Sequence, residues 1–222
     1  MPELTGTLLS LFHRGGPVMY PLLFCSLAAV TVFLERLWNL RRRRLIPGGF
    51  TKQVIEEVSK GALDQAKALC DRLPFSPMAR IAKAGLIQFG ENPEMIRFMV
   101  SEVGGQEAIG LQKYQRWLAT IAYIAPLLGL LGTVSGMIKA FDTIAVHSMG
   151  DPAMLAGGIS EALITTAAGL LIAIPVVILH RIVQSRAARL SLELDKEAVT
   201  LTEHLIKCSQ KNPSVTLAAS RA

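Results

Sequence analysis

Cysteine and charge are both scarce in this 222-residue chain. The three cysteines, Cys25, Cys70 and Cys208, are too few and too widely spaced for a disulfide scaffold or a metal site. Only 18% of the residues are charged, whereas 51% are hydrophobic. That balance excludes intrinsic disorder, which requires low hydrophobicity and high net charge. The chain is therefore folded, and it is more apolar than an average soluble domain.

Charge is absent altogether from three long stretches. They are residues 15–34, 117–138 and 162–179, which are twenty, twenty-two and eighteen residues long. A helix rises 1.5 Å per residue, so the stretches reach about 27–33 Å, close to the thickness of the hydrocarbon core of a bilayer. Helices buried in soluble proteins seldom need uncharged runs of this length. The sequence predicts an all-α, polytopic membrane protein with three transmembrane helices.

The first uncharged stretch differs from a secretory signal peptide. Its apolar run is longer than a signal peptide needs, and it is followed by Glu35-Arg36 and then by arginines, with no small-residue cleavage site. We expect it to remain part of the protein as the first transmembrane helix.

Lysine and arginine are distributed very unevenly between the segments that the three stretches separate. Of 23 such residues, 14 lie in residues 35–116 and seven in residues 180–222. By the positive-inside rule both segments are cytoplasmic, so the N-terminus is external. We expect an external N-terminus at 1–16, transmembrane helices at 17–38, 117–139 and 159–180, a cytoplasmic helical loop at 39–116, an external loop at 140–158, and a cytoplasmic C-terminal helix and tail at 181–222.

Four consecutive arginines, Arg41, Arg42, Arg43 and Arg44, follow the first stretch directly. A basic run can bind nucleic acid, but one placed at the end of a transmembrane helix is typical of a stop-transfer signal that anchors the helix at lipid headgroups. We interpret these arginines as a membrane anchor and expect no nucleic-acid partner.

The cytoplasmic segments have apolar residues at helical spacing. The spacing predicts amphipathic helices over 51–73 and 78–89, and a third helix that Asn92-Pro93-Glu94 begins, with Asn92 as its cap. The third helix is expected to run on into the second transmembrane stretch. The apolar pattern also continues past His180, which predicts that the third transmembrane helix extends into the cytoplasm.

Small residues and prolines interrupt the second and third stretches. Gly132 and Gly136 have the GxxxG spacing, which places two glycines on one helix face and permits close helix packing. A phosphate-binding loop is the alternative reading of this glycine-rich segment, but no Lys-Ser/Thr follows it. A proline inside a span removes one backbone hydrogen bond and can bend the helix. We assign to packing and kinks Gly129, Gly132, Gly136, Gly169, Pro126 and Pro175.

Few polar groups remain in the second and third stretches. Glu161 is the acid that directly precedes the third, and a carboxylate there is costly unless it faces water, a partner or lipid headgroups. Glu161 is therefore a candidate for the proton pathway, and a residue that meets lipid headgroups is the alternative. The hydroxyls of Thr133, Thr165 and Thr166 are candidates for a polar pathway, although a threonine can also bond its own helix. The spans hold no catalytic or metal-binding constellation, so we expect neither an enzyme nor a cofactor. They also lack a titratable group at depth. If the chain conducts protons, a partner must supply that group.

Two segments of the sequence closely resemble one protein family. The segments "LATIAYIAPLLGLLGTVSGMIKAF" (118–141) and "GISEALITTAAGLLIAIP" (158–175) are similar to the second and third spans of the MotA/TolQ/ExbB proton-channel family, most of all to the ExbB/TolQ branch. That branch has three spans with an external N-terminus, whereas the flagellar MotA branch has four. The first span and the cytoplasmic loop resemble the family more loosely.

The resemblance implies a proton-channel subunit of a motor in the bacterial inner membrane, with its external segments in the periplasm. It implies a pentamer around a central pore that encloses an ExbD/TolR-type single-span partner with one membrane Asp. The motor energises a TonB- or TolA-type protein that acts on the outer membrane, either for import or for envelope maintenance. The alternatives are a flagellar or gliding motor stator and a helical membrane scaffold that conducts nothing.

The resemblance also assigns individual residues. Aligned by motif, the family's two pore threonines fall on Thr133 and Thr166, and its third-span Glu falls on Glu161. Helical periodicity gives a different answer, because Thr165 shares the face of Glu161 whereas Thr166 lies about 140° round the helix. The motif favours Thr166, and Thr165 remains the second candidate for a position on the pore.

Overall fold

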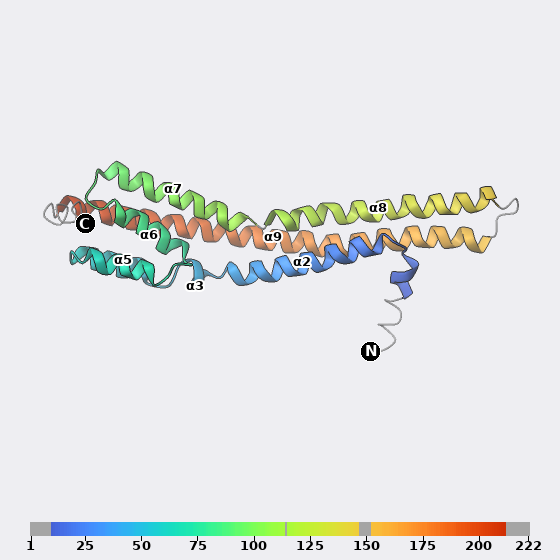
Figure 1. Ribbon diagram of the computed structural model, residues 1–222, viewed down its shortest axis with the longest axis horizontal. Helices are drawn as coiled ribbons and strands as arrows, with labels where there is room; N and C mark the ends of the chain where they lie inside the picture. The colour runs from blue at the N-terminus through green and yellow to red at the C-terminus, as the bar shows by residue number, and fades with distance from the viewer. Residues whose placement is uncertain (1–9, 114, 147–151, 212–222) are drawn as a thin grey trace. The chain divides into compact units, whose positions relative to one another are not determined.

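The computed structural model describes residues 10–113, 115–146 and 152–211, and within these ranges it contains helices and no strands. The chain divides into two compact units (Figure 1). Unit 1 comprises residues 1–36 and 114–183, and unit 2 comprises residues 37–113 and 184–222. Each unit has its own internal packing.

Three helical segments are long and apolar enough to cross a membrane, within Met19–Asn39, Pro93–Thr143 and Leu155–Lys211. The first is helix α2 (Met19–Asn39). The second contains α8 (Gln115–Val146), and the third lies in α9 (Pro152–Lys211). For the described residues, the prediction of an all-helical fold with three helices able to cross a membrane is confirmed.

The long helices extend beyond the predicted transmembrane boundaries. α8 continues to Val146, and α9 begins at Pro152, so most of the expected loop at 140–158 is helical; residues 147–151 lie outside the described ranges. α9 also continues past His180 to Lys211 as one helix. The expected helical continuation of the third span is therefore observed.

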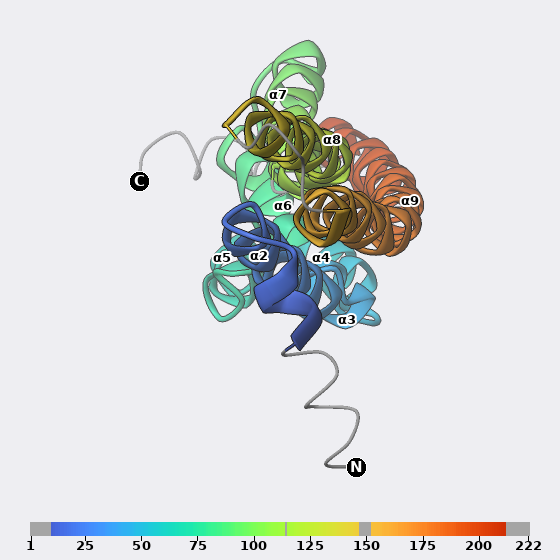
Figure 2. The same ribbon diagram turned by 90° about the vertical axis from the view of Figure 1, so that its right-hand side faces the viewer.

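Unit 1 has a core of small and aliphatic side chains from three helices. Val18 and Leu22 from the start of α2 pack with Ala125 of α8 and Ala173 of α9. Figures 1 and 2 both show α8 beside the first part of α9.

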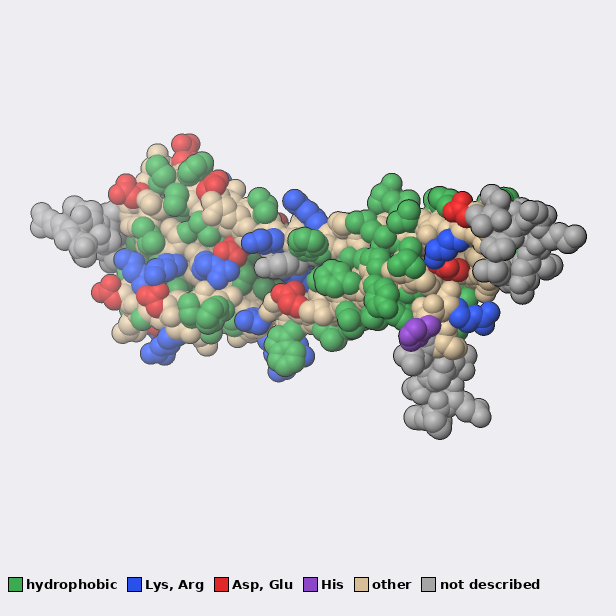
Figure 3. Space-filling model, turned by 45° about the vertical axis from the view of Figure 1, so that its right-hand side comes forward, with side chains coloured by type: hydrophobic (Ala, Val, Ile, Leu, Met, Phe, Trp, Pro, Cys, Tyr) green, Lys and Arg blue, Asp and Glu red, His purple; other side chains and the backbone are tan. Residues whose placement is uncertain are grey.

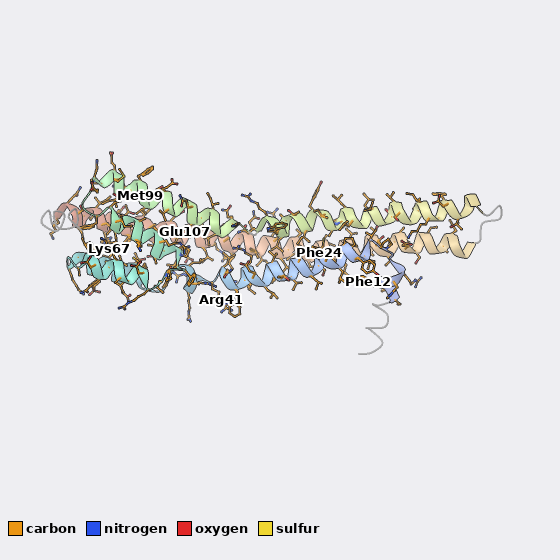
Figure 4. The ribbon with its side chains drawn as sticks, viewed as in Figure 1. Phe12, Phe24, Arg41, Lys67, Met99 and Glu107 are labelled. Carbon is orange, nitrogen blue, oxygen red and sulfur yellow. The ribbon has the colours of Figure 1, made fainter. Side chains whose placement is uncertain are left out.

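Most large apolar side chains of α2, α8 and the first part of α9 point away from this core, as Phe24 does at 73% exposure (Figure 4). Figure 3 shows this hydrophobic surface on unit 1.

Unit 2 contains two short helices where the sequence predicted one. α4 (Phe50–Ser59) and α5 (Leu63–Asp71) replace the single helix expected over 51–73. The break is at Gly61, whose φ of 79° is in the left-handed region that glycine adopts without strain. Its N–H donates to the carbonyl of Val58 and closes the end of α4. The prediction of one helix was wrong because it gave this glycine no weight as a C-terminal signal.

The next two helices each begin at a capping residue, and the sequence predicted the second of these caps. α6 (Pro77–Ile87) is capped by Ser76, whose Oγ accepts from the N–H of Ala79 and donates to the carbonyl of Leu45 at 2.9 Å. α7 (Pro93–Gln112) is capped by Asn92, whose Oδ1 accepts from the N–H of Glu94 at 3.1 Å. The predicted cap of the third cytoplasmic helix is therefore confirmed.

The predicted passage from that helix into the second span falls partly outside the described residues. α7 ends at Gln112, α8 begins at Gln115, and Tyr114 between them is not described.

An ion pair links α6 to α7. The guanidinium of Arg80 donates two hydrogen bonds to the carboxylate of Glu107, with Nη2 at 2.6 Å from Oε2 (Glu107 is labelled in Figure 4). A bidentate pair of this kind is stronger and more directional than a single contact. Gly85 of α6 lies close to both Val100 of α7 and Leu205 of α9, so the three helices share one core.

The four consecutive arginines have different surroundings in unit 2. Arg42, the first residue of the single-turn helix α3 (Arg42–Leu45), donates from Nε to Oε2 of Glu193 on α9 at 2.6 Å. Arg41 lies over the ring of Trp38 at 4.8 Å, and Arg44 donates to Oδ1 of Asn39. Arg42 thus has a structural role, because its side chain ties α3 to α9.

Cys70 on α5 should be nearly unreactive at neutral pH. Burial raises the pKa of its thiol to about 11; the carboxylate of Asp71 adds to the rise, and Lys83 opposes it. The thiolate is the reactive form, and a shift of this size lowers its fraction by about a hundredfold. In a C25A/C208A variant, Ellman's reagent at pH 8 should react with Cys70 about a hundredfold more slowly than in the same chain unfolded in SDS. Equal rates would contradict the buried position.

Candidate functional site

The two spans with the resemblance motifs pack against each other along a seam of small residues. On α8 this seam, hereafter the α8–α9 seam, contains Gly129, Gly132 and Gly136, and on α9 it contains Gly158 and Gly169. A Cβ added to Gly169 would lie 2.7 Å from the carbonyl oxygen of Ala125, and one on Gly136 would lie 2.7 Å from the carbonyl oxygen of Gly158. Such approach of backbone to backbone is what small residues permit in membrane helices.

Thr165 lies inside the α8–α9 seam. Its side chain is fully buried, and its hydroxyl donates to the carbonyls of Ala162 at 2.9 Å and Glu161 at 3.1 Å. The side chain occupies the space where Gly132 lacks a Cβ, since an added Cβ would collide with Oγ1, Cβ and Cγ2 of Thr165. In this chain the Thr165 hydroxyl therefore bonds its own helix and faces no open space.

Thr166 and Thr133 are placed differently. Thr166 is half-buried, and its hydroxyl donates across the seam to the carbonyl of Gly129 on α8 at 3.2 Å. Thr133 is also half-buried, and its hydroxyl donates to the carbonyl of Leu130 at 2.6 Å. Both residues retain exposed surface in the single chain, so a neighbouring molecule can contact them.

Glu161 is held by a cation from the other helix. Its Oε1 lies 2.5 Å from Nζ of Lys139 on α8, and its side chain is 17% exposed, whereas that of Lys139 is 50% exposed. Gly16, which precedes α2 and has a φ of 68°, packs directly against the Glu161 carboxylate. Glu161 therefore lies where the segment before α2, α8 and α9 meet.

The two prolines of the spans lie inside continuous helices. Pro126 is half-buried within α8, and Pro175 is exposed within α9. Ala125, next to Pro126, is fully buried and presents its carbonyl to Gly169 across the seam. The proline of α8 thus lies beside one of the closest helix–helix contacts.

Three residues of this site escaped the sequence reasoning: Gly158, Lys139 and Gly16. Gly158 completes the seam opposite Gly136, and the Gly157-Gly158 pair before the third stretch was its signal. Lys139 is the one Lys or Arg between residues 117 and 180, which could have identified it as a partner for Glu161. No sequence signal pointed to the contact between Gly16 and Glu161, because the two residues are far apart in the chain.

The described residues contain no cluster of three or more His, Cys, Asp or Glu side chains that could hold a metal ion. Between residues 117 and 138 and between residues 162 and 179 the sequence has no acidic, basic or histidine residue. The chemistry that the seam offers consists of hydroxyls, backbone carbonyls and one paired carboxylate.

Comparison with known proteins gives a consistent result. Residues 74–196, more than half of the chain, match the sequence model of the MotA/TolQ/ExbB proton channel family. A Synechocystis protein described as ExbB-like 1 is 35% identical over 187 residues, which is 82% of this chain and 72% of that protein. Biopolymer transport protein exbB1 of Vibrio cholerae is 32% identical over 178 residues, 77% of this chain and 76% of that protein.

A shorter match extends the comparison to the Tol-Pal system. Protein TolQ of Haemophilus influenzae is 41% identical over 75 residues, which is 34% of this chain and 33% of that protein. Three helices long and apolar enough to cross a membrane, two of them packed through glycines, are the architecture of a multi-pass helical membrane protein, and the family match places it in the channel or transport class. Within that class, the chain belongs to the MotA/TolQ/ExbB proton channel family, in its ExbB/TolQ branch.

Proposed function

We propose that this chain is the pore-forming subunit of a proton-driven motor in the bacterial inner membrane. The motor uses the proton-motive force to energise a TonB- or TolA-type protein that acts on the outer membrane. The observation that carries the proposal is the pair of half-buried threonines, Thr133 and Thr166, beside the α8–α9 seam in a chain of this family. Both hydroxyls belong to half-buried side chains on the two helices of the seam, where a neighbouring molecule can reach them.

Each polar residue of the site receives a role under this proposal. Thr133 and Thr166 line the proton pathway, and Glu161 lies beside it at the periplasmic end. Thr165 belongs to the packing of α8 against α9, because its side chain is fully buried against Gly132. The seam glycines hold the two helices close enough for both hydroxyls to lie on one wall.

A partner must supply the titratable group, because the two spans have none at depth. We propose an ExbD/TolR-type single-span protein whose membrane Asp lies beside Thr133 and Thr166. The large exposed apolar side chains of α2, α8 and α9 give surface for lipid and for other copies of the chain around such a partner. Five copies around the partner is the assembly that the resemblance implies.

The proposed orientation places the N-terminus in the periplasm and the C-terminus in the cytoplasm. It follows from the excess of Lys and Arg in residues 35–116 and 180–222. Arg41, Arg43 and Arg44 are exposed and follow the first span, so they are placed to meet anionic headgroups.

Proton uptake by proteoliposomes tests this proposal. The chain is co-purified with its single-span partner, reconstituted, and given an inside-negative potassium diffusion potential while an internal pH dye is followed. We expect uptake by the complex and no uptake above that of empty liposomes by this chain alone, because the chain has no titratable group at depth. Equal uptake by the chain alone and by the complex would contradict the role given to the partner, and no uptake by the complex would contradict conduction.

A further inference from the structure

An ion pair joins α8 to α9, near the C-terminal end of α8 and the N-terminal end of α9. Nζ of Lys139 lies 2.5 Å from Oε1 of Glu161. Figure 3 shows a small group of oppositely charged side chains interrupting the hydrophobic surface at this end of unit 1. The contact crosses between the two helices that carry Thr133 and Thr166, so it can fix their relative position.

The Glu161 carboxylate is enclosed by a second segment as well. A Cβ added to Gly16 would lie 2.8 Å from Cδ of Glu161, and the neighbouring Gly15 lies close to Ile164, one turn further along α9. Arg14 donates to Oγ of Ser160 at 3.3 Å. The segment before α2 is thus packed onto the same turn of α9 that the Lys139 ammonium holds from α8.

The two charges of the pair differ in their access to water. The Glu161 side chain is 17% exposed and that of Lys139 is 50% exposed. A carboxylate that is this far buried is costly without its cation, whereas a half-exposed ammonium can remain hydrated without its anion. Removing Lys139 should therefore be more damaging than removing the charge of Glu161.

We infer that Lys139 is a positioning residue that holds Glu161 and thereby clamps α8, α9 and the segment before α2 together beside the pathway threonines. Glu161 precedes Thr165 by one helical turn, and Thr165 fits against Gly132, so the clamp sets the register of the α8–α9 seam. Glu161 then acts by holding the helices and does not itself carry protons. The inference rests on the proposed function for its effect on conduction, and on the ion pair alone for its effect on stability.

Four variants test the clamp in two measurements: K139M, E161Q, K139M/E161Q and K139R. The thermal midpoint of the detergent-solubilised chain should fall by about 2–4 °C in K139M. It should rise again in K139M/E161Q, because the second change removes the unpaired carboxylate. Proton uptake by the reconstituted complex should change in parallel with the thermal midpoint. It should fall about tenfold in K139M, rise again in K139M/E161Q and be near normal in K139R. R116M, which removes an exposed cation at the other end of α8, is the matched control and should match the wild type.

Each contrary result has a distinct meaning. A K139M midpoint equal to the wild type, or a double variant no more stable than K139M, would overturn the clamp whether or not the complex conducts. Uptake abolished by E161Q but normal in K139M would show that the carboxylate carries protons itself, which overturns the inference and leaves the proposed function standing. Absence of uptake by the wild-type complex would contradict the proposed function, and the order of midpoints would still decide the clamp.

Discussion

Replacing Gly158 by alanine should force α8 away from α9 and prevent the chain from assembling stably. The added Cβ would lie 2.8 Å from the carbonyl oxygen of Gly136, 2.9 Å from Cβ of Ala140 and 3.1 Å from its backbone nitrogen. Two of these atoms belong to the backbone of α8, so no change of rotamer can relieve the contact. Overpacking of this kind costs about 1–3 kcal/mol of stability. The substituted residue would lie in the α8–α9 seam, where several other helix–helix contacts are equally close. Fluorescence-detected size exclusion with a heating step measures the loss.

Gly157 provides the matched control. It is the neighbouring residue on the same helix and is exposed, and a Cβ added there meets nothing within 4 Å in this chain. G157A should therefore be as stable as the wild type, or slightly more stable because alanine favours the helix. A G158A protein that elutes and melts like G157A would show that the helices are not packed at this distance.

Replacing Thr166 by valine should abolish energy coupling while the protein still assembles. Valine keeps the shape of threonine but removes the hydroxyl, which donates to the carbonyl of Gly129 at 3.2 Å. The loss of one such hydrogen bond costs only about 1 kcal/mol of stability, so folding should survive. The loss of a hydroxyl from the proposed pathway should stop proton transfer. The measurement is growth that depends on the TonB- or TolA-type system, with the amount of assembled complex checked in parallel.

Two further variants separate the hydroxyl from general effects of substitution. T166S retains the hydroxyl and should retain coupling. T31V removes a hydroxyl that donates to the carbonyl of Leu27 on the exposed side of α2, away from the seam, and should behave like the wild type. Normal coupling in T166V, at normal levels of complex, would remove Thr166 from the pathway. Loss of coupling in T165V without loss of stability would instead favour Thr165.

The sequence was informative about the fold wherever one physical requirement acted over many residues. A membrane-crossing helix must stay uncharged for about twenty residues, so all three such helices could be predicted. The cap at Asn92 depends on three adjacent residues and was equally readable, whereas the cap at Ser76 was not predicted. The break at Gly61 was missed because an apolar pattern that fits one helix also fits two short helices joined by a turn.

The site was harder to predict because its key contacts join distant parts of the chain. For the position on the pore, resemblance to the family motif favoured Thr166 and helical periodicity favoured Thr165. Neither could show which of the two side chains the neighbouring helix covers. That answer depends on the crossing of α8 and α9, where Gly132 leaves room for Thr165 and not for Thr166. The partner of Glu161 was missed for the same reason, since Lys139 approaches it only after the two helices have packed.

The most direct test of the account is proton uptake by proteoliposomes that contain the complex of this chain with its single-span partner. Uptake driven by a potassium diffusion potential is compared between the wild-type chain and a T133A/T166V variant incorporated in equal amounts. If the two hydroxyls line the pathway, the wild type takes up protons and the variant does so no faster than empty liposomes. Equal uptake by the two complexes would contradict the central claim that this chain forms the proton pathway through Thr133 and Thr166.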